Sequence, residues 1–282
     1  MMQWLVEPLS YAFMQRGMLA ALLVGMLCSV IGAYVVLRSM AFLGDALAHA
    51  VLPGVAIAYL LQGNLTVGAL VAAVVVALGI GFFSRKGTIK EDTAIGILFS
   101  AALSLGIVLI SSIRTYAVDL SHILFGNVLG VSAADLWLIL GISVIVLVTI
   151  LVFYKEFLVV SFDPTLAATL RIRVGFYTNL MLILLAMTIV VSMQTVGIGL
   201  VAAMLVTPGA TAFLITRRLP AMMAVSGVIG AISGVSGLYW SYYANVASGA
   251  AIVLTATAIF LLVFLFSPRK GVVVLALRKT AA

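Results

Sequence analysis

An aspartate and a histidine lie four residues apart inside an apolar stretch of this chain, at Asp45 and His49. In a helix this spacing places both side chains on one face, where they can bind the same ligand. Pro53 has no N–H to donate to the carbonyl of His49, so we expect that oxygen to be free. A carboxylate, an imidazole and a carbonyl form a mixed oxygen and nitrogen set that suits divalent transition metals. The spacing therefore predicts a metal site at Asp45 and His49.

A structural role for the same pair is the alternative. Asp45 could cap a helix that starts after Gly44, and His49 could hydrogen-bond to a neighbouring helix. An ionisable group inside a membrane is costly unless it faces a protein interior, a water-filled cavity or an ion. Capping accounts for Asp45 but explains His49 poorly, so metal binding is the favoured interpretation.

Membrane-spanning helices must hold these residues in place. The chain is 65% hydrophobic and only 8% charged, and apolar runs of about 20 residues, the length that crosses a bilayer, recur along it. No polar segment is long enough for a soluble domain, and the first apolar run lacks a signal-peptide cleavage pattern. We therefore expect an all-α, polytopic membrane protein in which residues 1–282 form one domain. The expected spans are 12–37, 44–61, 65–84, 93–113, 133–154, 175–194, 197–216, 220–241 and 248–267.

Two segments leave the number of spans open. If segment 44–61, which Pro53 interrupts, does not cross the bilayer completely, the chain has eight spans rather than nine. Segment 121–131 is apolar but too short to span, so it predicts a re-entrant or interfacial helix on the outer side.

Basic residues predict the orientation of the chain in a bacterial plasma membrane. With the N-terminus outside and nine spans, only Arg16 and Arg114 fall outside, and the other lysines and arginines fall on the cytoplasmic side. The C-terminus is then cytoplasmic. The net charge of +7 follows from this distribution and needs no nucleic-acid partner.

The loop 155–175 predicts a short amphipathic helix. Asp163 can cap a helix whose first residue is Pro164, and Arg171 lies near its C-terminal end. Two interpretations of such a helix stay open on the residues alone. It offers a surface to a cytoplasmic motor, or it rests on the lipid headgroups.

Other polar groups are candidates for a transport path. Asp119 and His122 could form a second acid and imidazole site on the outer side, although a contact that anchors a short helix or a docking partner explains them better. Pro208 frees the carbonyl of Met204, and both could line a path together with Thr207. A kink that serves only helix packing is the alternative.

Several catalytic motifs are absent from the sequence. It contains no Gly-x-x-x-x-Gly-Lys-Ser/Thr loop for ATP phosphates, no His-Glu-x-x-His pattern and no Gly-x-Ser-x-Gly elbow. The single cysteine, Cys28, excludes a disulfide framework within one chain. We expect a transport subunit rather than an enzyme, with any ATP hydrolysis in a separate partner.

Four separated motifs resemble those of the ABC-3 family, the membrane subunits of ABC importers for manganese, zinc and iron. The motifs are residues 38–54, 92–96, 122–127 and 203–208, and the resemblance covers most of the chain. It implies a type II-like importer domain that works as a homodimer, with two cytoplasmic ATPase subunits and an extracytoplasmic metal-binding protein. No permanently bound cofactor is expected, because the divalent metal is the transported substrate.

The resemblance also implies roles for individual residues. Asp45 and His49 match the acid and histidine that coordinate metal in the translocation path. Residues 161–173 are similar to the coupling helix that sits in a groove of the ATPase. The residues expected to contact the ATPase are Asp163, Pro164, Leu166, Leu170 and Arg171. The further residues expected along the path are Pro53, Asp119, His122, Asn127, Met204, Thr207 and Pro208.

Manganese is the favoured substrate, with zinc and iron as alternatives. Pro53 after His49 is similar to the manganese-type members of the family. A ligand set without thiolate suits manganese or ferrous iron, although zinc would bind it at least as tightly. Two rival classes are a proton-coupled secondary metal transporter and a non-transporting scaffold or sensor. The lack of a clear inverted repeat argues against the first, and the polar pair inside a span argues against the second.

Overall fold

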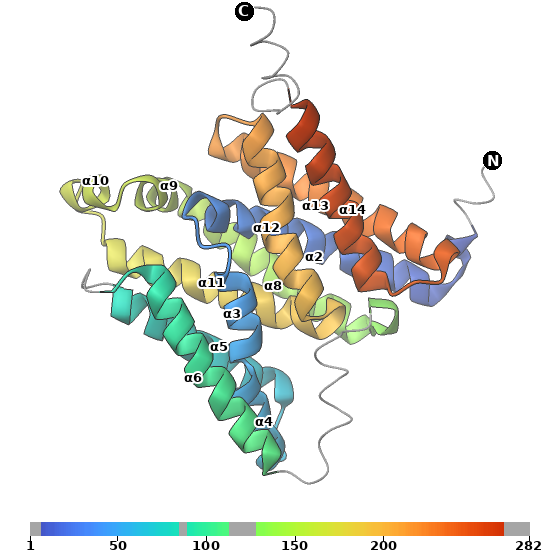
Figure 1. Cartoon of the computed structure of the whole chain (residues 1–282), viewed down its shortest axis with the longest axis horizontal. Helices are drawn as coiled ribbons and strands as arrows, with labels where there is room; N and C mark the ends of the chain where they lie inside the picture. Colours follow the sequence, from blue (N-terminus) through green and yellow to red (C-terminus); the bar gives the residue numbers. More distant parts are fainter. Residues whose placement is uncertain (1–6, 85–88, 113–127, 268–282) are drawn as a thin grey trace, which may run out of the picture.

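Every regular element is helical within residues 7–84, 89–112 and 128–267, which the computed structural model describes (Figure 1). The helices are η1 (Pro8–Ser10), α2 (Ala12–Leu37), α3 (Leu43–Ala50), α4 (Leu52–Leu60), α5 (Leu65–Ser84), α6 (Glu91–Ser111), η2 (Val128–Gly130), α8 (Ala133–Val152), α9 (Tyr154–Phe162), α10 (Pro164–Thr169), α11 (Val174–Val196), α12 (Ile198–Ile215), α13 (Leu219–Ala244) and α14 (Ser248–Phe266).

Nine segments of the described chain are long and apolar enough to cross a membrane, and α3 and α4 together form one of them. This finding confirms the predicted all-α class and the nine predicted spans, whose ends differ from the expected ones by at most three residues. Most of the helix predicted over 121–131 lies outside the described residues. Its described part, Val128–Gly130, is a single 3-10 turn.

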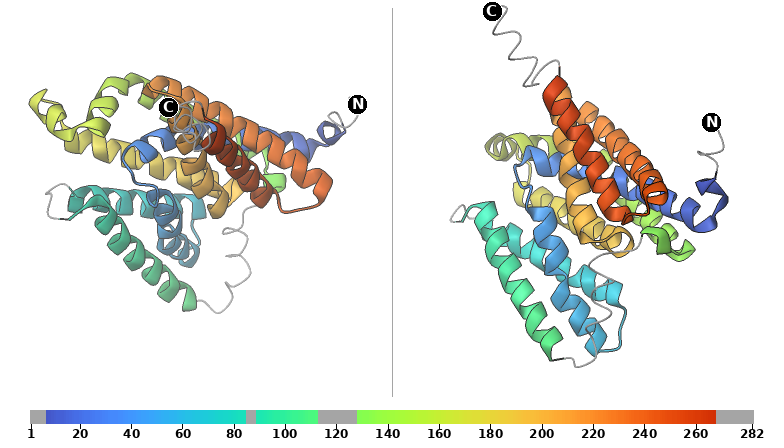
Figure 2. Two further views of the ribbon diagram at one scale, coloured as in Figure 1. Left: turned by 45° about the horizontal axis from the view of Figure 1, so that its top comes forward. Right: turned by 45° about the vertical axis from the view of Figure 1, so that its right-hand side comes forward.

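α2 is the central helix of the molecule. α12 and α13 pack along it, and α14 packs against those two helices. The segment from α3 to α6 forms a second group to one side (Figures 1 and 2). α11 contacts both α2 and α5, so it joins the two groups.

Glycines bring α2 very close to its two neighbours. A Cβ on Gly25 would overlap the carbonyl of Gly230 in α13, and a Cβ on Gly32 would overlap the carbonyl of Leu205 in α12. Small residues favour such contacts in membranes, where van der Waals packing drives helices together. The three helices therefore form a closely packed unit against which α3 is held.

The outer helices expose apolar side chains. Val71 of α5, Ile107 of α6, Val144 of α8 and Leu262 of α14 are each at least half exposed. In a membrane protein such faces are covered by lipid or by another subunit. Lipid tails are as apolar as these side chains, so either covering suits them. The polar residues of interest lie elsewhere, on α3 and at the start of α6.

Candidate metal-binding site

α3 carries both residues of the predicted metal site. Asp45 lies in its first turn and His49 in its last, which are the ends where the helix dipole favours an acid and an imidazole. Nε2 of His49 lies 3.6 Å from Oδ1 of Asp45, which is too long for a hydrogen bond. The His49 side chain is 31% exposed and the Asp45 side chain is 54% exposed. The Asp45 carboxylate and the His49 imidazole are therefore not hydrogen-bonded to each other, and both remain able to bind a metal ion.

The structure argues against a capping role for Asp45. α3 begins at Leu43, its N-cap residue is Phe42, and no side chain caps it. The described residues show no hydrogen bond from the His49 side chain to another span. Its ring instead lies 6.1 Å from the ring of Phe99 in α6.

The helix of this span is interrupted at Val51, between α3 and α4. Pro53 is the second residue of α4 and has no N–H to continue the helix. The N–H of Val51 points toward the carbonyl of His49, two residues back, but it does not form one of the backbone hydrogen bonds of the described turns. A free carbonyl at His49 therefore stays a prediction. A Cβ on Gly54 would overlap the carbonyl of Gly68, so the close approach of α5 sets the direction of α4.

A cavity of about 410 Å³ lies beside Asp45, between α3 and α6. Asp92, in the first turn of α6, lines this cavity together with Asp45, and Phe99 forms part of its wall. The sequence places Asp92 in a family motif, which is a signal for the residue, but the prediction did not include it in the site. Only the packing of α6 against α3 brings the two carboxylates to one cavity.

In the described part of one chain, the predicted metal site has two candidate side-chain ligands, Asp45 and His49. No group of three or more His, Cys, Asp or Glu side chains that could hold a metal occurs in that part of the chain. Divalent metals in proteins take roughly four or more ligands. A metal bound by Asp45 and His49 would therefore take its remaining ligands from water, a backbone carbonyl or another chain.

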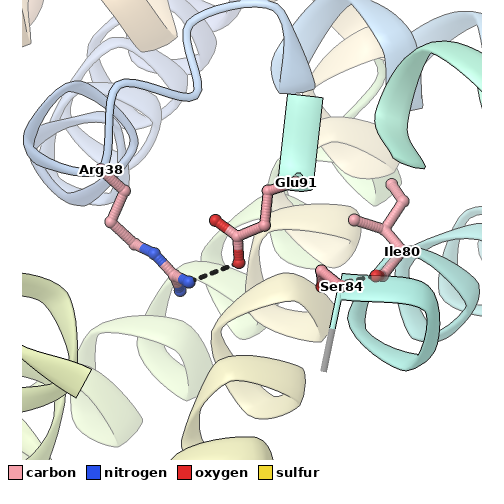
Figure 3. Close-up of polar contacts among 4 residues, drawn as sticks. All are labelled: Arg38, Ile80, Ser84 and Glu91. Carbon is pink, nitrogen blue, oxygen red and sulfur yellow. Dashed lines mark hydrogen bonds and ion pairs between the residues drawn. The ribbon is translucent and has the colours of Figure 1, made fainter. Parts of the chain in front are cut away.

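An ion pair joins the end of α2 to the start of α6, the helix that forms one wall of the cavity. Nη2 of Arg38, the residue after α2, lies 2.6 Å from Oε1 of Glu91, the first residue of α6 (Figure 3). The Arg38 side chain is 9% exposed. This burial lowers the pKa of the guanidinium from its ordinary value, and the Glu91 carboxylate opposes that shift. Ser39 follows with a left-handed backbone, φ 57°, and turns the chain toward α3. The pair thus ties the turn before Asp45 to the helix that carries Asp92.

We expect Glu91→Gln to destabilise the folded protein by about 1–3 kcal/mol, because it leaves a buried guanidinium without its counter-charge. Nη1 of Arg38 already lacks a hydrogen-bond partner among the described residues. The measurement is thermal unfolding of the purified chain in detergent. Glu156→Gln is the matched control, since Glu156 makes no ion pair within the described chain. Equal unfolding temperatures for the two variants would contradict the prediction.

The three candidates on α12 lie in a helix contact. α12 runs unbroken through Pro208. Met204 is buried, and its carbonyl, which Pro208 deprives of an N–H, accepts a hydrogen bond of 3.5 Å from the Ser29 hydroxyl of α2. The carbonyl of Thr207 accepts one of 2.7 Å from the Thr211 hydroxyl. The first contact joins α12 to α2, the second lies within α12, and a role of the three residues in the path stays a prediction.

Three further candidates, Asp119, His122 and Asn127, lie outside the described residues. Their places in the transport path stay predictions from the sequence.

The short helix predicted after Asp163 is present as α10. Pro164 is its first residue, and the Asp163 carboxylate accepts hydrogen bonds from the N–H groups of Thr165 (2.8 Å) and Leu166 (3.0 Å). This is the side-chain cap that the sequence predicted. Arg171 follows the helix with a left-handed backbone, φ 60°.

α10 presents an apolar face to its surroundings. Leu166 and Leu170 are 50% and 58% exposed, whereas Ala167 is buried against the rest of the chain. Exposed apolar side chains flanked by polar residues are typical of a surface that binds another protein.

Comparison with known proteins shows which family and which solved structure the chain resembles. The ABC 3 transport family matches residues 10–267. The "Manganese transport system membrane protein MntC" of Halalkalibacterium halodurans is 51% identical over 266 residues, which cover 94% of this chain and 91% of that protein. A "Probable iron transport system membrane protein" of Haemophilus influenzae is 40% identical over 267 residues, 95% of this chain and 98% of that protein. The solved structure "PsaBC from Streptococcus pneumoniae in complex with Fab" superposes with a TM-score of 0.85 at 39% identity, covering 97% of this chain and 99% of that one.

Proposed function

This chain belongs to the ABC 3 transport family, and we propose that it is the membrane subunit of an ATP-driven importer that carries manganese into the cytoplasm. The observation that carries the proposal is the Asp45 and His49 pair. Nε2 of His49 and Oδ1 of Asp45 lie 3.6 Å apart without a hydrogen bond between them, on one face of a membrane-spanning segment, and Asp45 lines a cavity. The permease subunit does not hydrolyse ATP itself.

Manganese is supported over iron by similarity and by the ligands. The manganese transport protein of Halalkalibacterium halodurans is 51% identical to this chain, whereas an iron transport protein of Haemophilus influenzae is 40% identical. A carboxylate and an imidazole without a thiolate suit manganese, although the same set would bind zinc as well or better. We therefore propose that selection against zinc depends partly on the protein that delivers the metal.

The proposed topology places the N-terminus outside and the C-terminus inside. With nine spans, the turn after α2, the start of α6, the loop with α10 and the turn between α12 and α13 then face the cytoplasm. Together with the loop between α5 and α6 and the C-terminal segment, these segments hold most lysines and arginines of the sequence, as the positive-inside rule expects. The cavity beside Asp45 lies toward the same side.

The proposed assembly contains two copies of this chain, two cytoplasmic ATPase subunits and an extracytoplasmic binding protein. A second copy would supply another Asp45 and His49, which is one way to complete a coordination shell that a single described chain leaves at two ligands. α10 is the proposed coupling helix, because it is capped, exposes leucines and lies outside the spans.

In the proposed cycle, Asp45 and His49 hold the partly dehydrated ion between the outward-facing and inward-facing states. The carboxylate compensates the ion's charge in an apolar bundle, where an uncompensated charge is costly. The imidazole contributes a neutral nitrogen ligand. On the inward side the ion passes the cavity that Asp45 shares with Asp92. ATP-driven movement reaches these helices through α10.

The test is metal uptake into proteoliposomes that contain this chain, its ATPase and its binding protein. We expect manganese uptake to require ATP and to be unaffected by a proton gradient alone. Uptake that runs on a proton gradient without the ATPase would instead establish a secondary transporter. Equal rates for manganese and zinc would remove the preference for manganese and leave the importer.

A further inference from the structure

A small cavity lies between the end of α9 and the turn that joins α12 to α13. Its volume is about 110 Å³. Phe162, the last residue of α9, lines it from one side, and Leu219 and Met222 of α13 line it from another. Arg217 and Arg218 of the turn also line it. The cavity therefore connects the segment that leads into α10 with a second loop at the same end of the molecule (Figure 1).

The surface around this cavity is apolar in its centre and basic at its edge. Phe162 is 63% exposed, and it is continuous in the chain with the exposed leucines of α10. Arg217 and Arg218 are exposed, and so are Arg171 and Arg173 after α10. A large exposed ring outside the membrane spans, rimmed by charges, is typical of a protein contact.

The turn between α12 and α13 is held in one shape by its own contacts. The Thr216 hydroxyl donates a 2.7 Å hydrogen bond to the carbonyl of Ala212. The Ser267 hydroxyl, directly after α14, donates a 3.2 Å hydrogen bond to the carbonyl of Leu214. Pro220 lies in the first turn of α13. A preformed surface loses little entropy when a partner binds.

We propose that the α12–α13 turn and Phe162 form a second docking point for the cytoplasmic ATPase, separate from α10. One apolar side chain of the ATPase enters the cavity, and acidic side chains beside it pair with Arg217 and Arg218. This inference rests on the proposed function, which supplies the ATPase. Lipid headgroups could pair with the arginines, but they would leave the Phe162 ring and its cavity, which continue the α10 surface, without an apolar partner.

A contact at this turn would act on the metal site through α12. α12 ends at the turn and packs against both α2 and α3. A Cβ on Gly44 would lie 2.8 Å from Cδ1 of Leu205 in α12, so α12 touches α3 at the residue next to Asp45. A contact at the second docking point would therefore let the ATPase move α12, which contacts α3 beside Asp45.

The experiment measures binding of the fluorescently labelled ATPase subunit to the full-length chain in lipid nanodiscs. The test variant is Arg217→Glu/Arg218→Glu, and the matched control is Lys90→Glu/Lys155→Glu, which reverses two exposed lysines away from the turn. Each pair is titrated in phosphatidylcholine alone and in phosphatidylcholine with phosphatidylglycerol. We expect the test variant to bind on the order of tenfold more weakly than the control in both lipids, with a weaker salt dependence than wild type. Phe162→Ala should weaken binding in the same direction with an unchanged unfolding temperature.

Three results would overturn the inference. Equal ATPase binding by the test and control variants would show that the turn does not touch the ATPase. A loss confined to nanodiscs with phosphatidylglycerol would assign the arginines to lipid headgroups. A wild-type chain that does not bind the ATPase at all would overturn the proposed function, and this inference with it, whereas the first two results leave the proposed function intact.

Discussion

Asp45→Asn is expected to reduce ATP-dependent manganese uptake by about 100-fold or more, because loss of a direct ligand exceeds the effect of losing a group that only orients one. Asparagine keeps the size of the side chain and removes the charge that compensates the ion. The carboxylate does not cap α3 and forms no hydrogen bond with His49, so the fold should survive. His49→Gln should give a similar loss through removal of the nitrogen ligand.

The measurement combines uptake in proteoliposomes with manganese binding to the purified chain, followed by electron paramagnetic resonance. Binding should weaken in both variants, while co-purification with the ATPase stays as in wild type. Asp92→Asn is the matched comparison, since Asp92 lines the same cavity from α6. A loss in Asp92→Asn as large as in Asp45→Asn would mean that the charge of the cavity, rather than ligation by α3, controls transport. Wild-type uptake in Asp45→Asn would return the pair to a structural role.

Leu166→Asp and Leu170→Asp are expected to release the ATPase from the membrane subunit and to abolish ATP-coupled uptake. Leu166 of α10 and Leu170, directly after it, are both at least half exposed, so the change does not open a cavity within the chain. A carboxylate on an apolar contact must be desolvated when the partner binds, and this opposes binding. Asp163→Ala should act more weakly in the same direction, because loss of the cap destabilises the helix by about 1 kcal/mol.

The readout is co-purification of the ATPase subunit, together with manganese binding to the isolated membrane subunit. Thr165→Asp is the matched control. It adds the same carboxylate to the first turn of α10, where the helix dipole favours an acid. An intact, ATP-coupled assembly in the leucine variants would contradict the coupling role of α10. Lost manganese binding in the same variants would show damage beyond the coupling surface.

The two docking regions make different contributions in this scheme. α10 is a short helix with exposed leucines, and it leads through α9 to the rest of the bundle. The α12–α13 turn ends a long helix that touches α3 directly. If both contact the ATPase, one subunit can act on α3 through two helices, α11, which follows α10, and α12, because both contact α3.

The sequence alone determined the class of the protein and the position of its spans. Apolar length is a local property, because each spanning helix must satisfy its backbone hydrogen bonds within itself. The nine segments and the cap at Asp163 were therefore predictable from neighbouring residues. The placing of Asp45 and His49 on one helical face was predictable for the same reason.

Only the tertiary structure decided what surrounds that face. Asp92 reaches the cavity of Asp45 because α6 packs beside α3, and the Arg38 and Glu91 ion pair joins residues 53 positions apart. The carbonyl of Met204 finds its partner in Ser29 of another helix, which no local pattern indicates. Contacts between helices in a membrane depend on close packing of small side chains rather than on a polar and apolar pattern. The sequence thus indicated the two residues proposed to bind metal, and the packing of α3 against α6 formed the cavity beside Asp45.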